Sequence, residues 1–199
     1  MGGFLGGEQS ELPGFWRAGK GQRFSCEESR GENDLGMMRL GFLAALLWFV
    51  VDQVTKWWIM NHLMVPPRVI PISGFFNIVL GRNTGVSFGL LGGASQWLLV
   101  TVAAAVLVML LVWMSRATSR LVAVALGLIA GGAVGNVVDR LRLGGVTDFL
   151  DFYLGEWHWP AFNMADVGIV CGVGLLLADS FIFGKDVESS PRDANADPS

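Results

Sequence analysis

The residues of this chain whose types could do chemistry are the acids that interrupt its apolar stretches. Asp139, Asp148 and Asp166 lie in one such region, Gly131–Asp166, which begins GGAVGNVVDRL, continues through VTDFLDF and ends at FNMAD. A carboxylate beside hydrocarbon is costly, so an acid in this setting indicates a functional site whose partner must be found. The function therefore depends on which of these acids meet.

Two of the acids have no Lys or Arg beside them in the sequence, Asp148 in VTDFL and Asp166 in MADVG. If they approach each other in an apolar setting, they cannot both ionise and must share one proton. One then acts as general base on a water, and the other acts as general acid toward a peptide carbonyl and its leaving amine. The pair predicts an aspartic protease. Asp151 is an alternative to Asp148 as a member of the pair. It is the less favoured of the two, because we expect Asp151 to lie on the polar face of the amphipathic piece that contains it.

The other intramembrane polar residues have simpler interpretations when each is taken alone. Asp52 and Lys56 are one helical turn apart, which allows an ion pair on one helix face. Asp139 is followed by Arg140 and preceded, three residues earlier, by Asn136. An acid beside a cation tends to stay ionised, and an Asn in a membrane helix often only bonds a neighbouring helix. These residues are therefore expected to support a site rather than to carry its reaction.

The composition is that of an integral membrane protein. Of 199 residues, 52% are hydrophobic and only 16% are charged, whereas a soluble domain has about 25% charged residues. Apolar runs near residues 38–60, 95–114, 121–138 and 161–183 each approach the length of about 20 residues that crosses a bilayer as a helix. We therefore predict an all-α fold, a bundle of four transmembrane helices. The net charge of −3, without a basic stripe, gives no sign of nucleic-acid binding.

The distribution of Lys and Arg in the flanks predicts that both termini are cytoplasmic. In that topology the polar ends of the first, third and fourth runs meet near the outer face, and Asp148 lies in the outer loop between the third and fourth runs. The site of a small proton-coupled transporter, the alternative function, would instead lie near the midplane between repeats. A non-enzymatic assembly protein, in which these polar groups only join helices, is a further alternative.

The segments outside the apolar runs are expected to differ in order. Residues 1–36 are polar and rich in Gly and Glu, and residues 185–199 are polar, so both are expected to be disordered, the second as a cytoplasmic tail. Residues 61–94 alternate Pro and Gly with short β-branched pieces, which predicts a small sheet. Residues 148–159, DFLDFYLGEWHW, form a short amphipathic piece. The membrane domain is then 37–184.

Cofactor chemistry is not indicated by the sequence. The only histidines, His62 and His158, lack the spacing of a ligand pair, and no HExxH motif is present, so no metal site is expected. No Gly-x-Ser-x-Gly motif for a serine nucleophile is present either. Water is therefore the only reactant that the predicted site requires besides its substrate.

Five blocks in order carry a resemblance to a known family: DQVTK at 52–56, NTGVSFGLL at 83–91, GGAVGNVVDRL at 131–141, VTDFLDFY at 146–153 and FNMAD at 162–166. Over about Met38 to Phe183 the chain resembles the bacterial lipoprotein signal peptidases, or signal peptidases II, which are membrane aspartic proteases. The resemblance implies a periplasmic β-cradle over residues 65–92 and a short periplasmic amphipathic helix over the aromatic piece before Pro160.

The resemblance also implies the activity, which is removal of signal peptides from prolipoproteins by a cut before a diacylglyceryl-modified cysteine. The partners would be these prolipoproteins and membrane lipids. The protein would lie in the inner membrane as a monomer, and it would need no cofactor. Its catalytic pair corresponds to Asp148 and Asp166. Its supporting and substrate-binding positions correspond to Asp52, Lys56, Asn83, Asn136, Asp139, Arg140 and Asn163.

Overall fold

The structure, a computed structural model, describes residues 21–85 and 96–183, with side chains from Leu35 onward. The chain divides into two compact units, Met1–Asn33 and Asp34–Ser199. All features described below belong to the second unit, apart from the start of the first helix.

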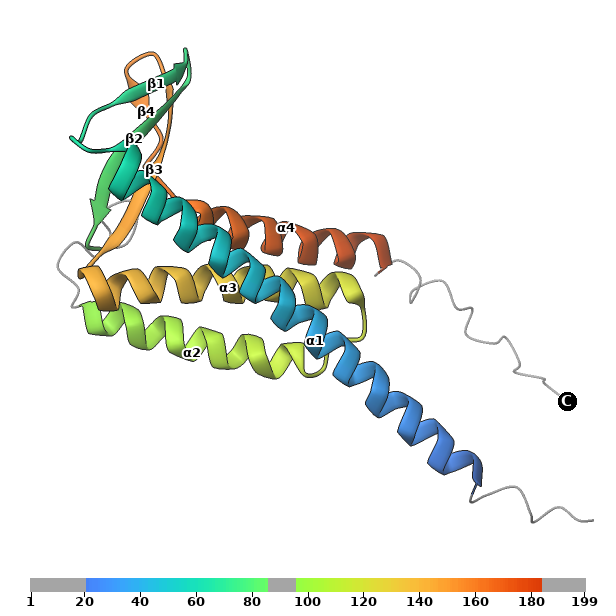
Figure 1. Cartoon of the computed structure of the whole chain (residues 1–199). Helices are drawn as coiled ribbons and strands as arrows, with labels where there is room; N and C mark the ends of the chain where they lie inside the picture. Colours follow the sequence, from blue (N-terminus) through green and yellow to red (C-terminus); the bar gives the residue numbers. More distant parts are fainter. Residues whose placement is uncertain (1–20, 86–95, 184–199) are drawn as a thin grey trace, which may run out of the picture. The chain divides into compact units, whose positions relative to one another are not determined.

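The apolar runs are helices (Figure 1). Helix α1 spans Gly21–Trp58 and continues as a π-helical turn, η1, over Ile59–Leu63; α2 spans Gln96–Met114, α3 Arg120–Leu143 and α4 Met164–Phe183. Within the described residues, four helices are long and apolar enough to cross a membrane. Helix α3 continues past the expected end of its apolar run at Val138, and this extension carries Asp139 and Arg140.

The N-terminal helix begins earlier than expected. Helix α1 starts at Gly21, inside the stretch 1–36 that the sequence places outside any element. Each residue added to an existing helix closes one further backbone hydrogen bond, so a helix can extend beyond the apolar run that starts it. Residues 1–20 and the expected tail, 185–199, lie outside the described residues.

A four-stranded antiparallel sheet lies beyond the end of the helices where α3 ends and α4 begins (Figure 1). Its order is β1-β2-β3-β4, with β1 at Ile70–Ser73, β2 at Phe76–Asn83, β3 at Val146–Leu154 and β4 at Trp157–His158. The hairpin of β1 and β2 confirms the small sheet predicted for residues 61–94 as far as Asn83. The part of the predicted β-cradle between residues 86 and 92 lies outside the described residues.

The prediction of a short amphipathic helix before Pro160 was wrong, whereas the expected combination of four apolar helices with a small sheet is confirmed. That segment is strand β3, a turn with Gly155 at φ 62°, and strand β4. Strand β3 pairs with β2 from Phe76 opposite Phe152 to Asn83 opposite Val146. Strand preference depends on the neighbours that a segment packs against. The partner of β3 lies about seventy residues earlier, so local spacing could not identify it.

Glycines on α3 allow its neighbours to approach its backbone closely. A Cβ atom at Gly127 would overlap the carbonyl oxygen of Gly41, and one at Gly131 would overlap that of Ala45, both on α1. On another face of α3, a Cβ atom at Gly132 would overlap the carbonyl oxygen of Ala165 on α4. Small residues at such contacts are typical of helix packing in membranes. Helix α3 is therefore the shared support for α1 and α4.

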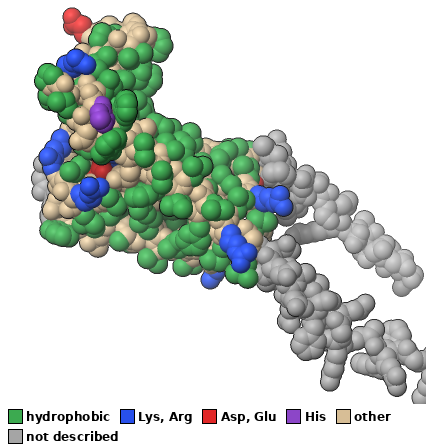
Figure 2. All heavy atoms as spheres, viewed as in Figure 1, with side chains coloured by type: hydrophobic (Ala, Val, Ile, Leu, Met, Phe, Trp, Pro, Cys, Tyr) green, Lys and Arg blue, Asp and Glu red, His purple; other side chains and the backbone are tan. Residues whose placement is uncertain are grey.

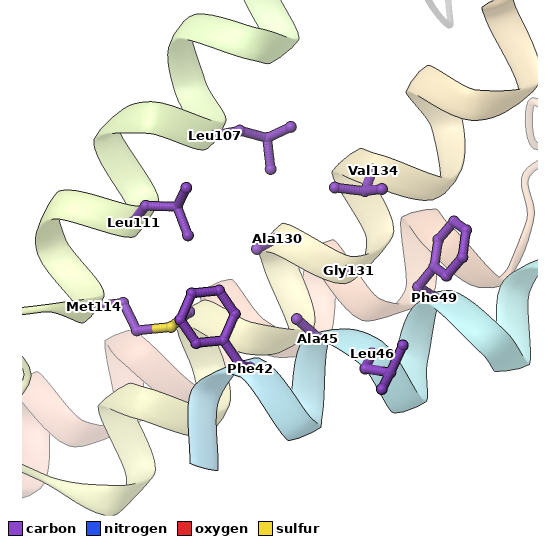
Figure 3. Close-up of a pocket in the computed structure, with 10 residues that line it drawn as sticks. All are labelled: Phe42, Ala45, Leu46, Phe49, Leu107, Leu111, Met114, Ala130, Gly131 and Val134. Atoms are coloured by element: carbon purple, nitrogen blue, oxygen red, sulfur yellow. The ribbon is translucent and has the colours of Figure 1, made fainter. Parts of the chain in front are cut away.

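An apolar cavity of about 350 Å³ lies between α1, α2 and α3. Figure 3 shows Phe42, Leu46 and Phe49 of α1 on one side and Leu107 and Leu111 of α2 on the other, with α3 between them. Figure 2 shows hydrophobic side chains covering most of the visible face of the helices, whereas Lys and Arg gather near the two ends of the bundle. This surface suits the hydrocarbon region of a bilayer.

We predict that Gly168→Ala destabilises the fold, whereas Gly174→Ala on the same helix does not. The indole N–H of Trp48 donates to the carbonyl oxygen of Met164 at 2.7 Å, and a Cβ atom at Gly168 would overlap that indole nitrogen. We expect the free energy of unfolding of Gly168→Ala to be about 1–3 kcal/mol lower than that of the wild type, as for other overpacked contacts. Nothing lies within 4 Å of a Cβ atom at Gly174. Thermal unfolding in detergent measures both variants, and equal midpoints would contradict the prediction.

Candidate active site

The candidate site is built around the buried ammonium group of Lys56, which is 1% exposed. Its Nζ atom lies 2.9 Å from Asp52 Oδ2, 3.1 Å from Asp139 Oδ2 and 3.1 Å from Asn136 Oδ1. A lysine ammonium has three N–H donors, and here each has an acceptor. A buried charge is tolerated only when it is paired and hydrogen-bonded. The three acceptors therefore hold α1 and α3 in one register.

The two carboxylates beside Lys56 also bind the elements that carry the rest of the site. Asp52 Oδ1 accepts a hydrogen bond from the backbone N–H of Ala165 in the first turn of α4, at 2.8 Å. Asp139 Oδ2 accepts one from the backbone N–H of Thr147 in β3, at 3.1 Å. Each acid is therefore both a counter-ion for Lys56 and an anchor for a neighbouring element.

Gln53 joins these two carboxylates, and sequence reasoning did not identify it. Its Nε2 atom donates to Asp52 Oδ2 at 3.1 Å and to Asp139 Oδ1 at 3.1 Å. The signal that could have found it is an amide beside an acid on the inner side of an apolar helix. Because the amide gives a donor to each acid, it lowers the repulsion between two carboxylates that share one cation.

Asn136 connects Lys56 to Asp166. Since the Asn136 Oδ1 atom accepts from Lys56, its Nδ2 atom faces the other way and donates to Asp166 Oδ1 at 3.0 Å. The amide of Asn163 extends this connection, because its Nδ2 atom donates to Asp148 Oδ1 at 2.6 Å and also lies 3.3 Å from Asn136 Oδ1. The two amides therefore link one oxygen of Asp148 to one oxygen of Asp166.

Asn163 and Asp166 also form the start of helix α4. The Asp166 backbone N–H donates to Asn163 Oδ1 at 3.2 Å, and the Asn163 backbone N–H donates to Asp166 Oδ2 at 3.2 Å. These reciprocal bonds have the pattern of a capping box, and a negative charge in a first helical turn is favoured by the helix dipole. The hydrogen bonds that cap the start of helix α4 therefore also fix the orientation of the Asp166 carboxyl group.

Asp148 lies in strand β3, outside the membrane-spanning helices, and is 4% exposed. The pKa of the Asp148 carboxyl is raised to about 6, mainly by burial and in smaller part by the nearby charge of Asp166. These effects outweigh the hydrogen bonds from Asn163 and Asn83 and the charge of Lys56, which lower the pKa. Asp148 therefore keeps its proton to a higher pH than an ordinary aspartate does.

Arg140 and Asn83 close the site on the side of the sheet. Arg140 Nη1 donates to the backbone oxygen of Asn136 at 3.2 Å, and Nη2 donates to that of Gly85 at 3.4 Å. Asn83 Oδ1 accepts from the Gly85 backbone N–H at 3.1 Å. The structure thus brings together every residue that the sequence predicted for the site: Asp52, Lys56, Asn83, Asn136, Asp139, Arg140, Asp148, Asn163 and Asp166.

Comparison with known proteins identifies the family of this site. The family model described as signal peptidase (SPase) II matches residues 44–182, most of the chain. The chain belongs to the signal peptidase II family. The matched range contains every residue of the site.

Curated relatives and solved structures agree with this membership. A lipoprotein signal peptidase of Beijerinckia indica subsp. indica is 43% identical over 146 residues, covering 71% of this chain and 87% of the relative. One from Rhodopseudomonas palustris is 42% identical, covering 76% and 98%. A bacterial membrane enzyme solved by the in meso method at 2.3 Å resolution is 28% identical with a TM-score of 0.64, covering 77% of this chain and 92% of its own.

Asp151, the alternative member of the carboxyl pair, faces a different environment in this signal peptidase II. It pairs with His158 Nδ1 at 2.8 Å and accepts from Asn77 Nδ2 at 3.0 Å, both within the sheet. Burial opposes ionisation of Asp151, but the hydrogen bonds from His158 and Asn77 outweigh it and lower its pKa. Residues three apart on a strand point to opposite faces, so Asp151 supports the hairpin rather than the site of Asp148.

We predict that Lys56→Met strongly destabilises the protein, whereas Arg142→Met does not. Removal of Lys56 leaves the buried carboxylates of Asp52 and Asp139 without a cation, and breaking a buried pair in this way costs about 3–5 kcal/mol. Arg142 is exposed near the end of the same helix α3, and loss of a surface charge changes stability by about 0.5 kcal/mol or less. Thermal unfolding of both variants in detergent measures the difference, and similar midpoints would refute the role given to Lys56.

Proposed function

We propose that this signal peptidase II cleaves peptide bonds with Asp148 and Asp166 as its catalytic pair. One observation carries the assignment: in the described part of the chain, the ion pairs made by Lys or Arg are those of Lys56 with Asp52 and Asp139. Asp148 and Asp166 instead accept hydrogen bonds from the neutral amides of Asn163 and Asn136. A carboxyl that is not fixed in an ion pair can exchange a proton during the reaction, whereas Asp52 and Asp139 are held in place by Lys56 and by backbone N–H groups.

The geometry supports a division of labour between the two carboxyls. Asp148, whose pKa is raised to about 6, holds the proton and acts as general acid toward the carbonyl oxygen of the substrate. Asp166 takes a proton from a water as its oxygen bonds to the carbonyl carbon. The carbon–nitrogen bond then breaks as Asp166 gives its proton to the leaving amine. A hydroxyl of the tetrahedral intermediate returns a proton to Asp148 as the new carboxyl group forms, so the pair regains its starting state. The reaction consumes one water and needs no cofactor.

The substrate that fits this site is a prolipoprotein whose cysteine carries a diacylglyceryl group. The curated relatives are lipoprotein signal peptidases, and the depth of the carboxyls supports the same substrate here. Asp166 lies in the first turn of α4, and Asp148 follows the end of α3, so both lie at the end of the apolar helices. Acyl chains in one leaflet would hold the neighbouring peptide bond at that depth.

The orientation follows from charge. Arg116 and Arg120 flank the connection between α2 and α3, opposite the sheet end of the bundle. Positive residues favour the cytoplasmic side, so both termini are cytoplasmic, and the sheet and carboxyls lie at the outer face of the inner membrane. The family gives no support to the transporter alternative.

We predict that Asp148→Asn and Asp166→Asn each abolish cleavage of a diacylglyceryl prolipoprotein, whereas Asp151→Asn retains it. Loss of a general acid or base lowers the rate by about a hundredfold to ten-thousandfold. The measurement is processing by purified protein, with thermal unfolding to show that each variant folds. Substantial cleavage by folded Asp148→Asn or Asp166→Asn would contradict the assignment. A loss of cleavage in Asp151→Asn as large as in these two variants would contradict it as well.

A further inference from the structure

A groove of about 460 Å³ opens beside the candidate site on the outer side of helix α4. It is lined by the aromatic segment before the helix, with Trp159 and Phe162, and by α4 itself. Asp166 lies in its lining together with Val167, Val170 and Cys171. The carboxyl of Asp166 is the single charged group of this lining. The groove therefore has a polar start, and its remaining walls are apolar.

The groove runs along α4 toward the interior of the membrane. Asp166 and Val170 are four residues apart and share a helix face, as do Val167 and Cys171. From Asp166 to Cys171 the helix advances about 8 Å. Val170 is 70% exposed and Cys171 is exposed as well, so no other part of the described chain covers this end of the groove. A molecule bound here would have its polar end at the carboxyl and hydrocarbon along α4.

We propose that this groove binds one acyl chain of the diacylglyceryl group on the substrate cysteine, at the end nearest the glyceryl ester. The inference rests on the proposed function. The scissile bond must lie at Asp148 and Asp166, and the lipid is attached one residue away, so its chains leave the site from the polar start of the groove. Apolar walls beginning at Asp166 continue the path that the chain takes into the leaflet.

The length of the groove favours an acyl chain over the signal peptide. A signal-peptide helix that crosses the hydrocarbon core needs a partner surface of about 30 Å, whereas the groove ends at Cys171 after about 8 Å. One turn beyond Val170, at Gly174, an added Cβ atom would have no neighbour within 4 Å. The surface of α4 is open there, so the groove shelters only the first part of a chain that continues among the lipids.

The kinetic test fills the groove and compares a matched position below it. Val170→Phe and Cys171→Phe add a ring inside the groove, and Gly174→Phe adds the same ring on the Val170 face of α4 beyond it. We expect kcat/KM for a diacylglyceryl prolipoprotein to fall about tenfold in the first two variants, as an overpacked contact would cause. Gly174→Phe should match the wild type. Equal activity of all three variants, with thermal unfolding showing each to be folded, would overturn the proposal.

A cross-linking test separates the acyl chain from the signal peptide. Asp148→Asn, which holds substrate without cutting it, is exposed to two prolipoproteins, one with a diazirine near the ester end of an acyl chain and one with a diazirine in the apolar part of the signal peptide. We expect the acyl probe to label the segment 159–171, and the label to disappear when Cys171→Phe is added. Labelling of this segment by the signal-peptide probe alone would overturn the proposal. If wild-type protein cleaves no diacylglyceryl prolipoprotein, the proposed function fails, and the groove assignment fails with it; cleavage with acyl labelling elsewhere refutes the groove alone.

Discussion

The complete pairing of one buried ammonium group is the constraint on which the rest of this structure depends. Lys56 is almost without exposure, and its acceptors come from its own helix α1 and from α3. A charge of this kind is tolerated only with every donor satisfied. The consequence for chemistry is indirect: because Asn136 must offer its oxygen to Lys56, its amide nitrogen faces Asp166. The ammonium pairs with two acids and, through Asn136, orients a third that it does not touch.

The close approach of the helices is part of the same arrangement. A Cβ atom at Gly135 of α3 would overlap Asp52 Oδ2, so this position must be glycine for Asp52 to reach Lys56 and the backbone of Ala165. Glycines at Gly131 and Gly132 bring α1 and α4 against the same helix. Packing and electrostatics therefore cannot be separated here. The small residues set the distances from α3 to α1 and α4. The buried charge of Lys56 fixes the register of α1 against α3 in which the polar residues of the site meet.

Much of this could be predicted from the sequence. The lengths of the apolar runs predicted four helices, and the motif blocks identified a set of polar residues that the structure brings together. Sequence reasoning did not identify Gln53 as a site residue, because an uncharged amide in an apolar run does not by itself indicate a site. Its role depends on two acids that are far apart in the sequence. Strand β3 was mistaken for a helix because its pairing partner β2 is distant. The start of α1 at Gly21 was not predicted, because an apolar run indicates which residues cross the bilayer and not where the helix begins.

The central claim is that Lys56 and its two acids leave Asp148 and Asp166 to share one proton, held by Asp148. The most direct measurement is the pH profile of kcat/KM, which reports the protonation of the free enzyme. A carboxyl whose pKa is raised to about 6 keeps its proton below that pH and loses it above. The account predicts that kcat/KM falls about tenfold per pH unit above about pH 6, where Asp148 loses its proton. A kcat/KM that instead rises steadily from about pH 5 to pH 8 would contradict it.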